Sequence, residues 1–159
     1  MVERWPRIQS SATFVSWKHK GRLRGCLGTF TPLPVGEVLC KYAIASRFRP
    51  ITKDELPELQ VHVSLLSQFE PTSHPHDWQI GVHGVAIKFH DGECAFHATY
   101  LPEIAAEEGW SHAETITSLI RKSGYHGTMG VEDLNQMVIT RYQSRKIVLT
   151  YSEYLESES

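Results

Sequence analysis

Residues 22–30 read Arg-Leu-Arg-Gly-Cys-Leu-Gly-Thr-Phe, and they predict a strand whose faces carry unusual chemistry. Because successive side chains of a strand point to opposite faces, Arg24, Cys26 and Gly28 are expected on one face. A nearby cation lowers the pKa of a cysteine, and the thiolate is the reactive form. Strand glycines let a ligand or another backbone approach closely. The stretch therefore has the residue types of a functional site.

The same residues also have a purely structural interpretation. Free cysteine is among the most buried residue types and often only fills core space. Glycine in a strand often marks a bulge without function. Spacing alone favours this structural interpretation over a catalytic one.

The apolar pattern around this strand predicts a mixture of strands and short helices. Strands are expected over residues 13–18, 22–30, 59–69, 84–90, 94–99 and 138–150. A turn at His19-Lys20-Gly21 would join the first two strands, and a turn at Asp91-Gly92 would join 84–90 to 94–99. The last stretch is either one strand or two strands broken near Ser144. Helices are expected over residues 35–46, as one turn beginning at Thr52, from Pro102 to Gly109, and from Ser111 to Gly124. Helices and strands do not alternate regularly, which predicts an α+β fold with a mixed, largely antiparallel sheet and flanking helices.

The strand expected after residue 58 has a clear two-residue period. Its apolar residues Leu59, Val61, Val63 and Leu65 are expected to face the core. Its polar residues Gln60, His62 and Ser64 are expected to face solvent.

Length and composition are typical of a soluble globular chain. With 159 residues the chain forms one domain or two small lobes that share a core. No apolar run approaches the length of a membrane span, and the first residues lack the apolar core of a secretion signal. The three cysteines, at positions 26, 40 and 94, form no CxxC pair, which favours a reducing compartment. We therefore expect the protein in the cytoplasm, the nucleus or both.

The net charge of −2 conceals an asymmetry between the two halves. Residues 1–53 hold ten Lys or Arg and two acids, whereas residues 54–159 hold six Lys or Arg and sixteen acids. Such asymmetry is typical of chains with an anionic partner, although a basic half that folds against an acidic half would cancel much of the field. Nucleic acid is not the expected partner, because no recognition motif is present.

Two histidine-containing stretches are weaker candidates. His83 lies between glycines in Gly81-Val82-His83-Gly84, where it would act as a base for Cys26 or bond its own backbone in a turn. The run His74-Pro75-His76-Asp77 offers possible metal ligands, but no further ligand has suitable spacing, which favours a solvated loop.

Four arginines of the basic half are candidates for an anion-binding site. Arg47 and Arg49 follow the first expected helix and, with Arg22 and Arg24, would form an anion-binding patch. The motifs that hold nucleotides, zinc or a serine nucleophile are absent from the sequence. No metal and no cofactor are therefore expected.

Several further stretches, in order along residues 14–155, resemble one known family. They are Tyr42-Ala43, Arg47-Phe48-Arg49-Pro50-Ile51, Glu55-Leu56-Pro57-Glu58-Leu59, Val63-Ser64-Leu65-Leu66, Asp77-Trp78-Gln79-Ile80-Gly81-Val82-His83-Gly84, Ala98-Thr99-Tyr100-Leu101-Pro102-Glu103, Gly109-Trp110, Thr140-Arg141-Tyr142-Gln143-Ser144 and Tyr151-Ser152-Glu153-Tyr154-Leu155. Together with residues 22–30, they are similar to the AMME chromosomal region protein family, the AMME syndrome candidate.

The resemblance implies an α+β fold of two intimately joined lobes, with the cysteine motif lining a cleft. It also implies an intracellular protein, and the company of Memo-like and radical-SAM proteins in prokaryotes points to an enzymatic pathway. The biochemical activity of the family is unsettled. With the reasoning above, the candidate catalytic residues are Cys26 and His83. The candidate ligand-binding residues are Arg24, Gly25, Gly28, Thr29, Arg47 and Glu103.

This chain departs from the family pattern in two places. A further N-terminal helix and strand normally precede the region that matches Thr13, and residues 1–12 stand there as a divergent segment. The segment before Arg47 is shorter, and Ser46 replaces an acidic residue that would bind a ligand or hold the arginine. A truncated or alternatively spliced product would have these features. We expect a single domain over residues 13–155 and a tail over 156–159.

Two classes of function follow. In the first, the protein is an enzyme, or the remnant of one, that binds a small anionic ligand, with Cys26 as nucleophile or acid–base group, Arg24 as its charge partner and His83 as base. In the second, it is a non-catalytic adaptor that binds a protein partner. For Arg24, the alternatives are an open pocket shared with Cys26 and an internal ion pair with an acid after residue 53, such as Glu103.

Overall fold

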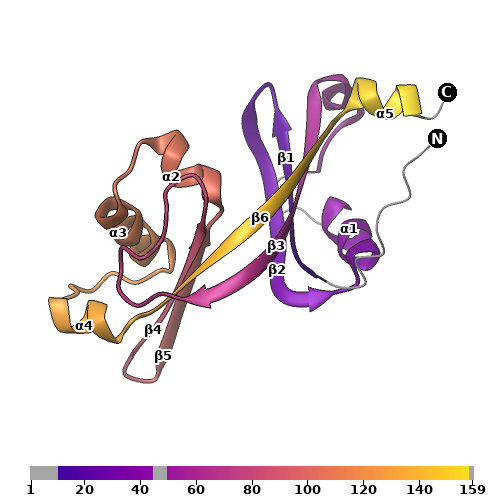
Figure 1. Cartoon of the computed structure of the whole chain (residues 1–159). Coiled ribbons are helices and arrows are strands. Elements are labelled where there is room, and N and C mark those ends of the chain that lie inside the picture. The colour runs from indigo at the N-terminus through magenta and orange to yellow at the C-terminus, as the bar shows by residue number, and fades with distance from the viewer. Residues whose placement is uncertain (1–10, 45–49, 158–159) are drawn as a thin grey trace. The chain divides into compact units, whose positions relative to one another are not determined.

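A computed structural model describes residues 11–44 and 50–157 of the chain (Figure 1). The strands are β1 (Ser11–His19), β2 (Arg22–Leu33), β3 (Leu59–Pro71), β4 (Gly84–Asp91), β5 (Cys94–Tyr100) and β6 (Val138–Thr150). The helices are α1 (Val35–Ile44), the 3₁₀ helix η1 (Lys53–Glu58), α2 (Pro102–Glu108), α3 (His112–Lys122), α4 (Val131–Gln136) and α5 (Tyr151–Ser157). The strands form one sheet in the order β2-β1-β3-β6-β4-β5, so the expected α+β class with an antiparallel sheet is confirmed.

The chain divides into two compact units. Unit 1 comprises residues 1–66 and 145–159, and unit 2 comprises residues 67–144. The long strands β3 and β6 each contribute residues to both units. The sequence left β6 open as one strand or two, and the structure has one.

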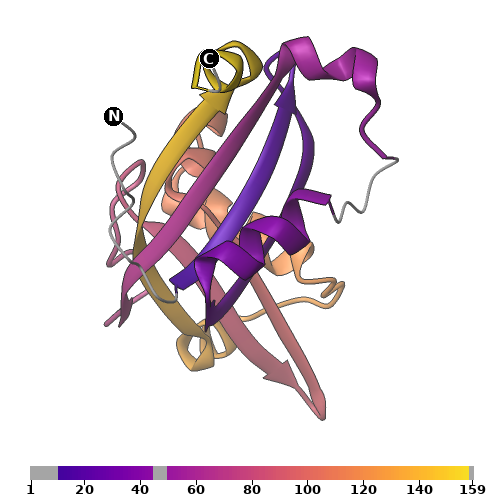
Figure 2. The same ribbon diagram turned by 90° about the vertical axis from the view of Figure 1, so that its right-hand side faces the viewer.

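Unit 1 is built on the hairpin of β1 and β2, as the sequence predicts. Lys20 and Gly21 form its two-residue turn with φ angles of 52° and 75°, the positive values that tight hairpin turns require. Helix α1 packs against both strands (Figures 1 and 2). Val38 on α1 and Val15 on β1 are almost completely buried.

One expectation for β3 is wrong. His62 and Ser64, expected to face solvent, are only 8% and 3% exposed, whereas Val61 and Val63 are half-buried. The alternating pattern identifies a wet face only when one side of a sheet is open to solvent. Here the face that carries His62 and Ser64 is covered, so the polar residues of the strand are buried.

Unit 2 has its own apolar core between the β4–β5 hairpin and the helices α2 and α3 (Figure 1). The core residues are Trp78, Val85, Ile87, Phe89, Ala105, Ile116, Leu119, Met137 and Ile139. Asp91 pairs with Cys94, so the hairpin turn is Gly92-Glu93 and lies one residue later than expected.

The helices of unit 2 follow their sequence signals closely. Pro102 begins α2, and Gly109 ends it with a φ of 68°. Ser111 caps α3 through a reciprocal capping box with Glu114. The short helices α4 and α5 were not predicted.

Some predictions concern parts of the chain outside the described residues. Arg47, Ser46 and the expected end of the first helix lie there, as do residues 1–10. Among the described residues, no helix is long and apolar enough to cross a membrane.

Candidate functional site

Cys26 lies at one end of a polar row that crosses three strands of unit 1, β2, β1 and β3. It pairs with Ser16 on β1, and the Ser16 hydroxyl donates a hydrogen bond to Cys26 Sγ at 3.1 Å. Ser16 in turn pairs with His62 on β3. Residues that pair directly across antiparallel strands share a face, so thiol, hydroxyl and imidazole lie on the same face of the sheet.

The spacing of this row limits its chemistry. Two strand spacings, roughly 10 Å, separate Cys26 from His62, which is too far for a direct hydrogen bond. Ser16 is the residue between them. The arrangement therefore places a hydroxyl donor directly on the sulfur and an imidazole one strand farther away.

Arg24 lies where the pairing of β1 and β2 is irregular. Trp17 pairs with Gly25, and Lys18 pairs with Leu23, so Arg24 is an extra residue on β2. This is the arrangement of a β-bulge. The pairing is therefore regular from Gly25 to Thr29 and is interrupted at Arg24.

The Arg24 guanidinium is engaged by a carboxylate. Its Nε donates to Glu55 Oε1 at 2.7 Å, and its Nη2 donates to Glu55 Oε2 at 3.2 Å. The two side chains are only 12% and 10% exposed. Nη2 also donates to the Pro50 carbonyl. Of the two alternatives left open for Arg24, the structure has an internal ion pair, and its acid is Glu55 on η1.

Glu55 has a second set of donors. Its Oε2 accepts the backbone N–H of Thr52 at 2.8 Å, as part of the capping box that begins η1. The hydrogen bond from Arg24, followed by that from Thr52, lowers the pKa of Glu55 to about 2. The same pair raises the pKa of Arg24 above its ordinary value, chiefly through the hydrogen bond to Glu55. Glu55 is therefore ionised throughout the neutral range.

The other candidates on β2 have ordinary structural surroundings. A Cβ on Gly28 would overlap the ring of Phe14, so that ring fills the space above the glycine. Gly25 is buried opposite Trp17. Thr29 Oγ1 accepts the N–H of Thr31 at 3.1 Å. Their roles in ligand binding stay predictions.

A basic cavity lies at the end of the β1–β2 hairpin. It has a volume of about 480 Å³, and we call it the hairpin cavity. It is lined by His19, Lys20, Arg22, Leu23 and Arg24. His19 and Lys20 pair with Glu58, but within the described part of the chain Arg22 has no ion-pair partner.

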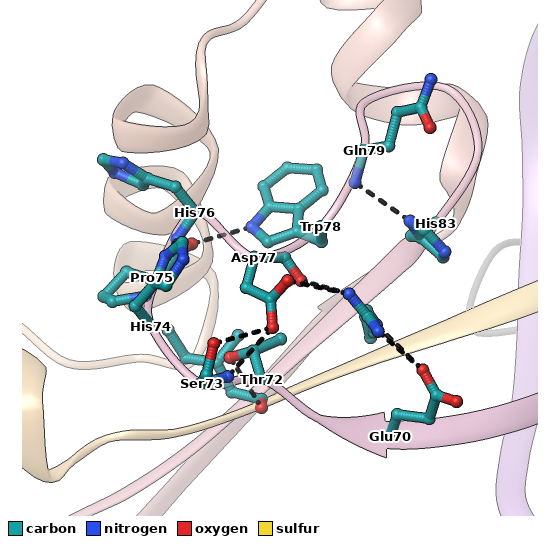
Figure 3. Close-up of polar contacts among 12 residues, drawn as sticks. Glu70, Thr72, Ser73, His74, Pro75, His76, Asp77, Trp78, Gln79 and His83 are labelled. Atoms are coloured by element: carbon teal, nitrogen blue, oxygen red, sulfur yellow. Dashed lines mark hydrogen bonds and ion pairs between the residues drawn. The ribbon is translucent and has the colours of Figure 1, made fainter.

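In unit 2, the loop between β3 and β4 is held by a dense polar network (Figure 3). Arg141 on β6 bridges Glu70 and Asp77 at 2.9 Å each. Asp77 also accepts hydrogen bonds from the N–H and hydroxyl of Ser73, which are the main cause of its lowered pKa. Trp78 Nε1 donates to the Pro75 carbonyl. The network gives the polar residues Glu70, Ser73 and Asp77 partners within the protein.

His83 belongs to unit 2 and takes the turn role that its sequence left open. Its Nδ1 accepts the backbone N–H of Gln79 at 3.0 Å (Figure 3). The neutral ring then carries its proton on Nε2, so a role as base requires that this hydrogen bond break. The pairing of His83 with Cys26 stays a prediction.

The roles predicted for Glu103 and Arg47 in ligand binding stay predictions. Glu103 lies in the first turn of α2 in unit 2, and Arg47 lies outside the described residues. No group of three or more His, Cys, Asp or Glu residues in the described ranges is placed to hold a metal ion.

Sequence reasoning missed three residues around β2. Ser16 faces Cys26 by register, which follows from the hairpin once its two-residue turn is recognised. Glu55 follows Thr52 by three residues, the spacing of a capping box, and a capping carboxylate has a second oxygen for another donor. Nothing in the local pattern marked His62 as buried.

Comparison with known proteins agrees with the resemblance noted in the sequence. The AMMECR1 family model matches residues 3–147. An uncharacterised protein of Schizosaccharomyces pombe is 42% identical over 160 residues, which cover 96% of this chain and 81% of that protein. An uncharacterised protein of Arabidopsis thaliana is 42% identical over 154 residues, covering 89% and 72%. The solved structure of the uncharacterised protein PH0010 from Pyrococcus horikoshii has the same fold, with a TM-score of 0.75 and 23% identity over 93% of this chain and 78% of that one.

Proposed function

Since the chain belongs to the AMMECR1 family, we propose that it is an intracellular protein, of cytoplasm or nucleus, that binds a small anionic ligand at the strand of residues 22–30. Cys26 would supply thiol chemistry at the same strand. The free thiols of Cys26 and Cys94 suit a reducing compartment.

The hairpin cavity is the observation that carries this proposal. Four of its five lining residues are basic or, for His19, become cationic on protonation. Its volume of about 480 Å³ suits a small molecule. Lys20 is already paired with Glu58 and Arg24 with Glu55, so among the described residues of the cavity Arg22 supplies the arginine without an ion pair. A guanidinium matches the paired oxygens of a carboxylate or phosphate.

Arg24 acts in this proposal mainly as a positioning residue. Its charge is balanced by Glu55, so it adds little net attraction for an anion. Its ion pair instead connects β2 to η1 next to the cavity and fixes the bulge that lies between Arg22 and Cys26.

Phosphate at 10 mM is expected to raise the melting temperature of the parent chain, and Arg22→Gln should abolish the rise. An anion with a dissociation constant near ~1 mM would add about 1.4 kcal/mol of stability at this concentration. That corresponds to a rise of about 4 °C for a chain of this size. Differential scanning fluorimetry at constant ionic strength measures the rise, with sodium chloride in place of phosphate as the screening control.

Arg145→Gln is the matched control variant. Arg145 is an exposed arginine of unit 1 that does not line the hairpin cavity, so its removal changes net charge equally and should leave the rise intact. A full rise in Arg22→Gln, or an equal rise with sodium chloride, would contradict the proposal.

Cys26 is expected to alkylate faster than Cys94 near neutral pH, although Cys94 is exposed and Cys26 is half-buried. In this proposal the hydroxyl of Ser16 orients the sulfur of Cys26 for attack through the hydrogen bond that it donates. One such bond contributes about 1 kcal/mol, so Ser16→Ala should slow the labelling of Cys26 about fivefold. Timed iodoacetamide labelling followed by peptide mass spectrometry measures each cysteine separately.

The labelling of Cys94 is the internal reference, because it should not change in Ser16→Ala. Protection of Cys26 until the chain unfolds, or equal rates for both cysteines, would return Cys26 to the purely structural interpretation.

Exposed apolar side chains of unit 1 support the second candidate function, that of a non-catalytic adaptor that binds a protein partner. Unit 1 exposes a run of large apolar side chains on the end of β6 and on α5. They are Ile147, Val148, Leu149, Tyr154 and Leu155, each 39–48% exposed. Ile147 and Leu149 share one face of β6, and exposed apolar patches are typical of surfaces that bind proteins. An adaptor would show no response to phosphate and no preferential reactivity at Cys26.

A further inference from the structure

Unit 2 holds a cavity that is larger than the hairpin cavity. Its volume is about 690 Å³, within the usual range for sites that bind small molecules. Its lining residues come from α3, from residues 125–134, which lead into α4, and from Pro75 and His76 in the loop between β3 and β4. We call it the α3 cavity.

The floor of the α3 cavity is apolar. Ile116 and Ile120 of α3 line it, together with Met129 and Leu134. Ile116 belongs to the core of unit 2, and the other three pack against that core. Such a floor favours a ligand with an apolar body, and a flexible Met adapts to the shape of a ring.

One lining residue brings a permanent positive charge to the α3 cavity. Arg121 lines the cavity, with His76 and His126 as further lining residues. Arg121 makes no ion pair within the described ranges, and a guanidinium is charged at every physiological pH. Its neighbour Lys122, by contrast, donates to the Thr99 carbonyl and lies over the ring of Tyr100.

Two acidic residues lie near one lining residue of the cavity, Tyr125. Asp91 and Asp133 lie near the hydroxyl of Tyr125 and raise its pKa, after the larger effect of burial. An anionic group is therefore disfavoured next to Tyr125 and favoured next to Arg121.

We propose that the α3 cavity binds a small aromatic carboxylate, with the ring over the apolar floor and the carboxylate on the guanidinium of Arg121. The apolar floor alone would accept a neutral ring as well, and Arg121 provides the preference for the anion. This site is separate from the hairpin cavity, because every residue that lines it belongs to unit 2.

A pair of probes with the same ring tests the proposal. 2-Naphthoate carries the carboxylate, and 2-naphthalenemethanol is its neutral counterpart. Titration of the full chain, followed by amide NMR, should shift residues 113–129, and the carboxylate should bind at least about fivefold more tightly than the alcohol. Arg121→Gln should remove this preference while leaving the affinity for the alcohol unchanged.

Two variants keep the result unambiguous. Ala113→Phe changes an exposed α3 residue that lines the cavity, so it should block both probes by occupying the space. Arg145→Gln removes an equal charge elsewhere and should leave both affinities unchanged. Equal affinity for the two probes, no effect of Arg121→Gln, or shifts confined to unit 1 would overturn the proposal.

Discussion

Gly84→Ala is expected to lower the free energy of unfolding by about 3 kcal/mol, the upper end of the usual cost of overpacking a core. A Cβ at position 84 of β4 would overlap the ring of Tyr142. That ring is completely buried, and its hydroxyl bonds the Thr99 hydroxyl at 2.7 Å and the Tyr100 carbonyl at 2.9 Å. The tyrosine cannot move aside without losing these hydrogen bonds. The hydroxyl is deeply buried, and this burial raises the pKa of Tyr142 well above its ordinary value.

Gly36→Ala is the matched control for this substitution. Nothing lies within 4 Å of a Cβ built at Gly36, which is an exposed position of α1. Alanine favours a helix over glycine by up to about 1 kcal/mol, so this variant should be as stable as the parent or more so. Urea unfolding measures both variants. A Gly84→Ala variant as stable as the parent would show that Tyr142 can shift at little cost.

Gly28 shows what a glycine in a sequence can and cannot reveal. The motif predicts that something approaches the backbone closely at this position, and the ring of Phe14 does so. The bare Cα indicates a close approach but not whether a ligand or a side chain makes it. Gly28 and Gly84 thus have the same relation to an aromatic ring on a neighbouring strand.

The elements that sequence predicted well have strong local signals. The hairpin turn at Lys20-Gly21 and the capping box at Ser111 depend on a few adjacent residues. Helix α5 was missed, although Thr150 and Glu153 form a similar box at its start. A box followed by only one or two turns of helix is a weak signal, because so short a helix depends on tertiary packing.

The candidate site was harder to predict because its contacts join distant segments. Arg24 and Glu55 are separated by 31 residues, and only the folded sheet brings η1 to β2. The bulge at Arg24 also breaks the alternation on which the prediction of its face depended. Charge alone indicated that Arg24 would have either a ligand or an acid, and it could not decide between them.

Glu55→Gln is expected to lower the melting temperature at neutral pH. The melting temperature of this variant should also fall less than that of the parent when the pH is lowered. At neutral pH the variant leaves the largely buried guanidinium of Arg24 without a counter-charge, and removing one partner of such a pair is destabilising. The amide oxygen of glutamine still accepts a hydrogen bond from Thr52, so the cap of η1 is retained in part. Thermal unfolding between pH 7 and pH 2 measures both effects.

The direction of the pH effect follows from the two states of the carboxyl group. In the unfolded chain Glu55 has its ordinary pKa of 4.5, and in the folded chain its pKa is about 2. Between these values the unfolded chain binds a proton that the folded chain excludes, so acid favours unfolding. The contribution of Glu55 is complete above pH 4.5 and is lost as the pH falls through about 2. The melting temperatures of the parent and Glu55→Gln should therefore converge across this range.

Glu58→Gln separates this effect from the general effect of losing an acid. Glu58 lies on the same 3₁₀ helix and also pairs with basic residues, but its side chain is 51% exposed. Exposed ion pairs contribute little, so this variant should melt close to the parent at every pH. Equal losses for the two variants, or a Glu55→Gln curve parallel to that of the parent, would contradict a special role for Glu55.

Because Arg24→Gln should also destabilise the chain when no anion is present, loss of phosphate binding in that variant would follow from either role of Arg24. Arg22→Gln, which breaks no ion pair between residues that the structure describes, is therefore the variant that tests the ligand site itself.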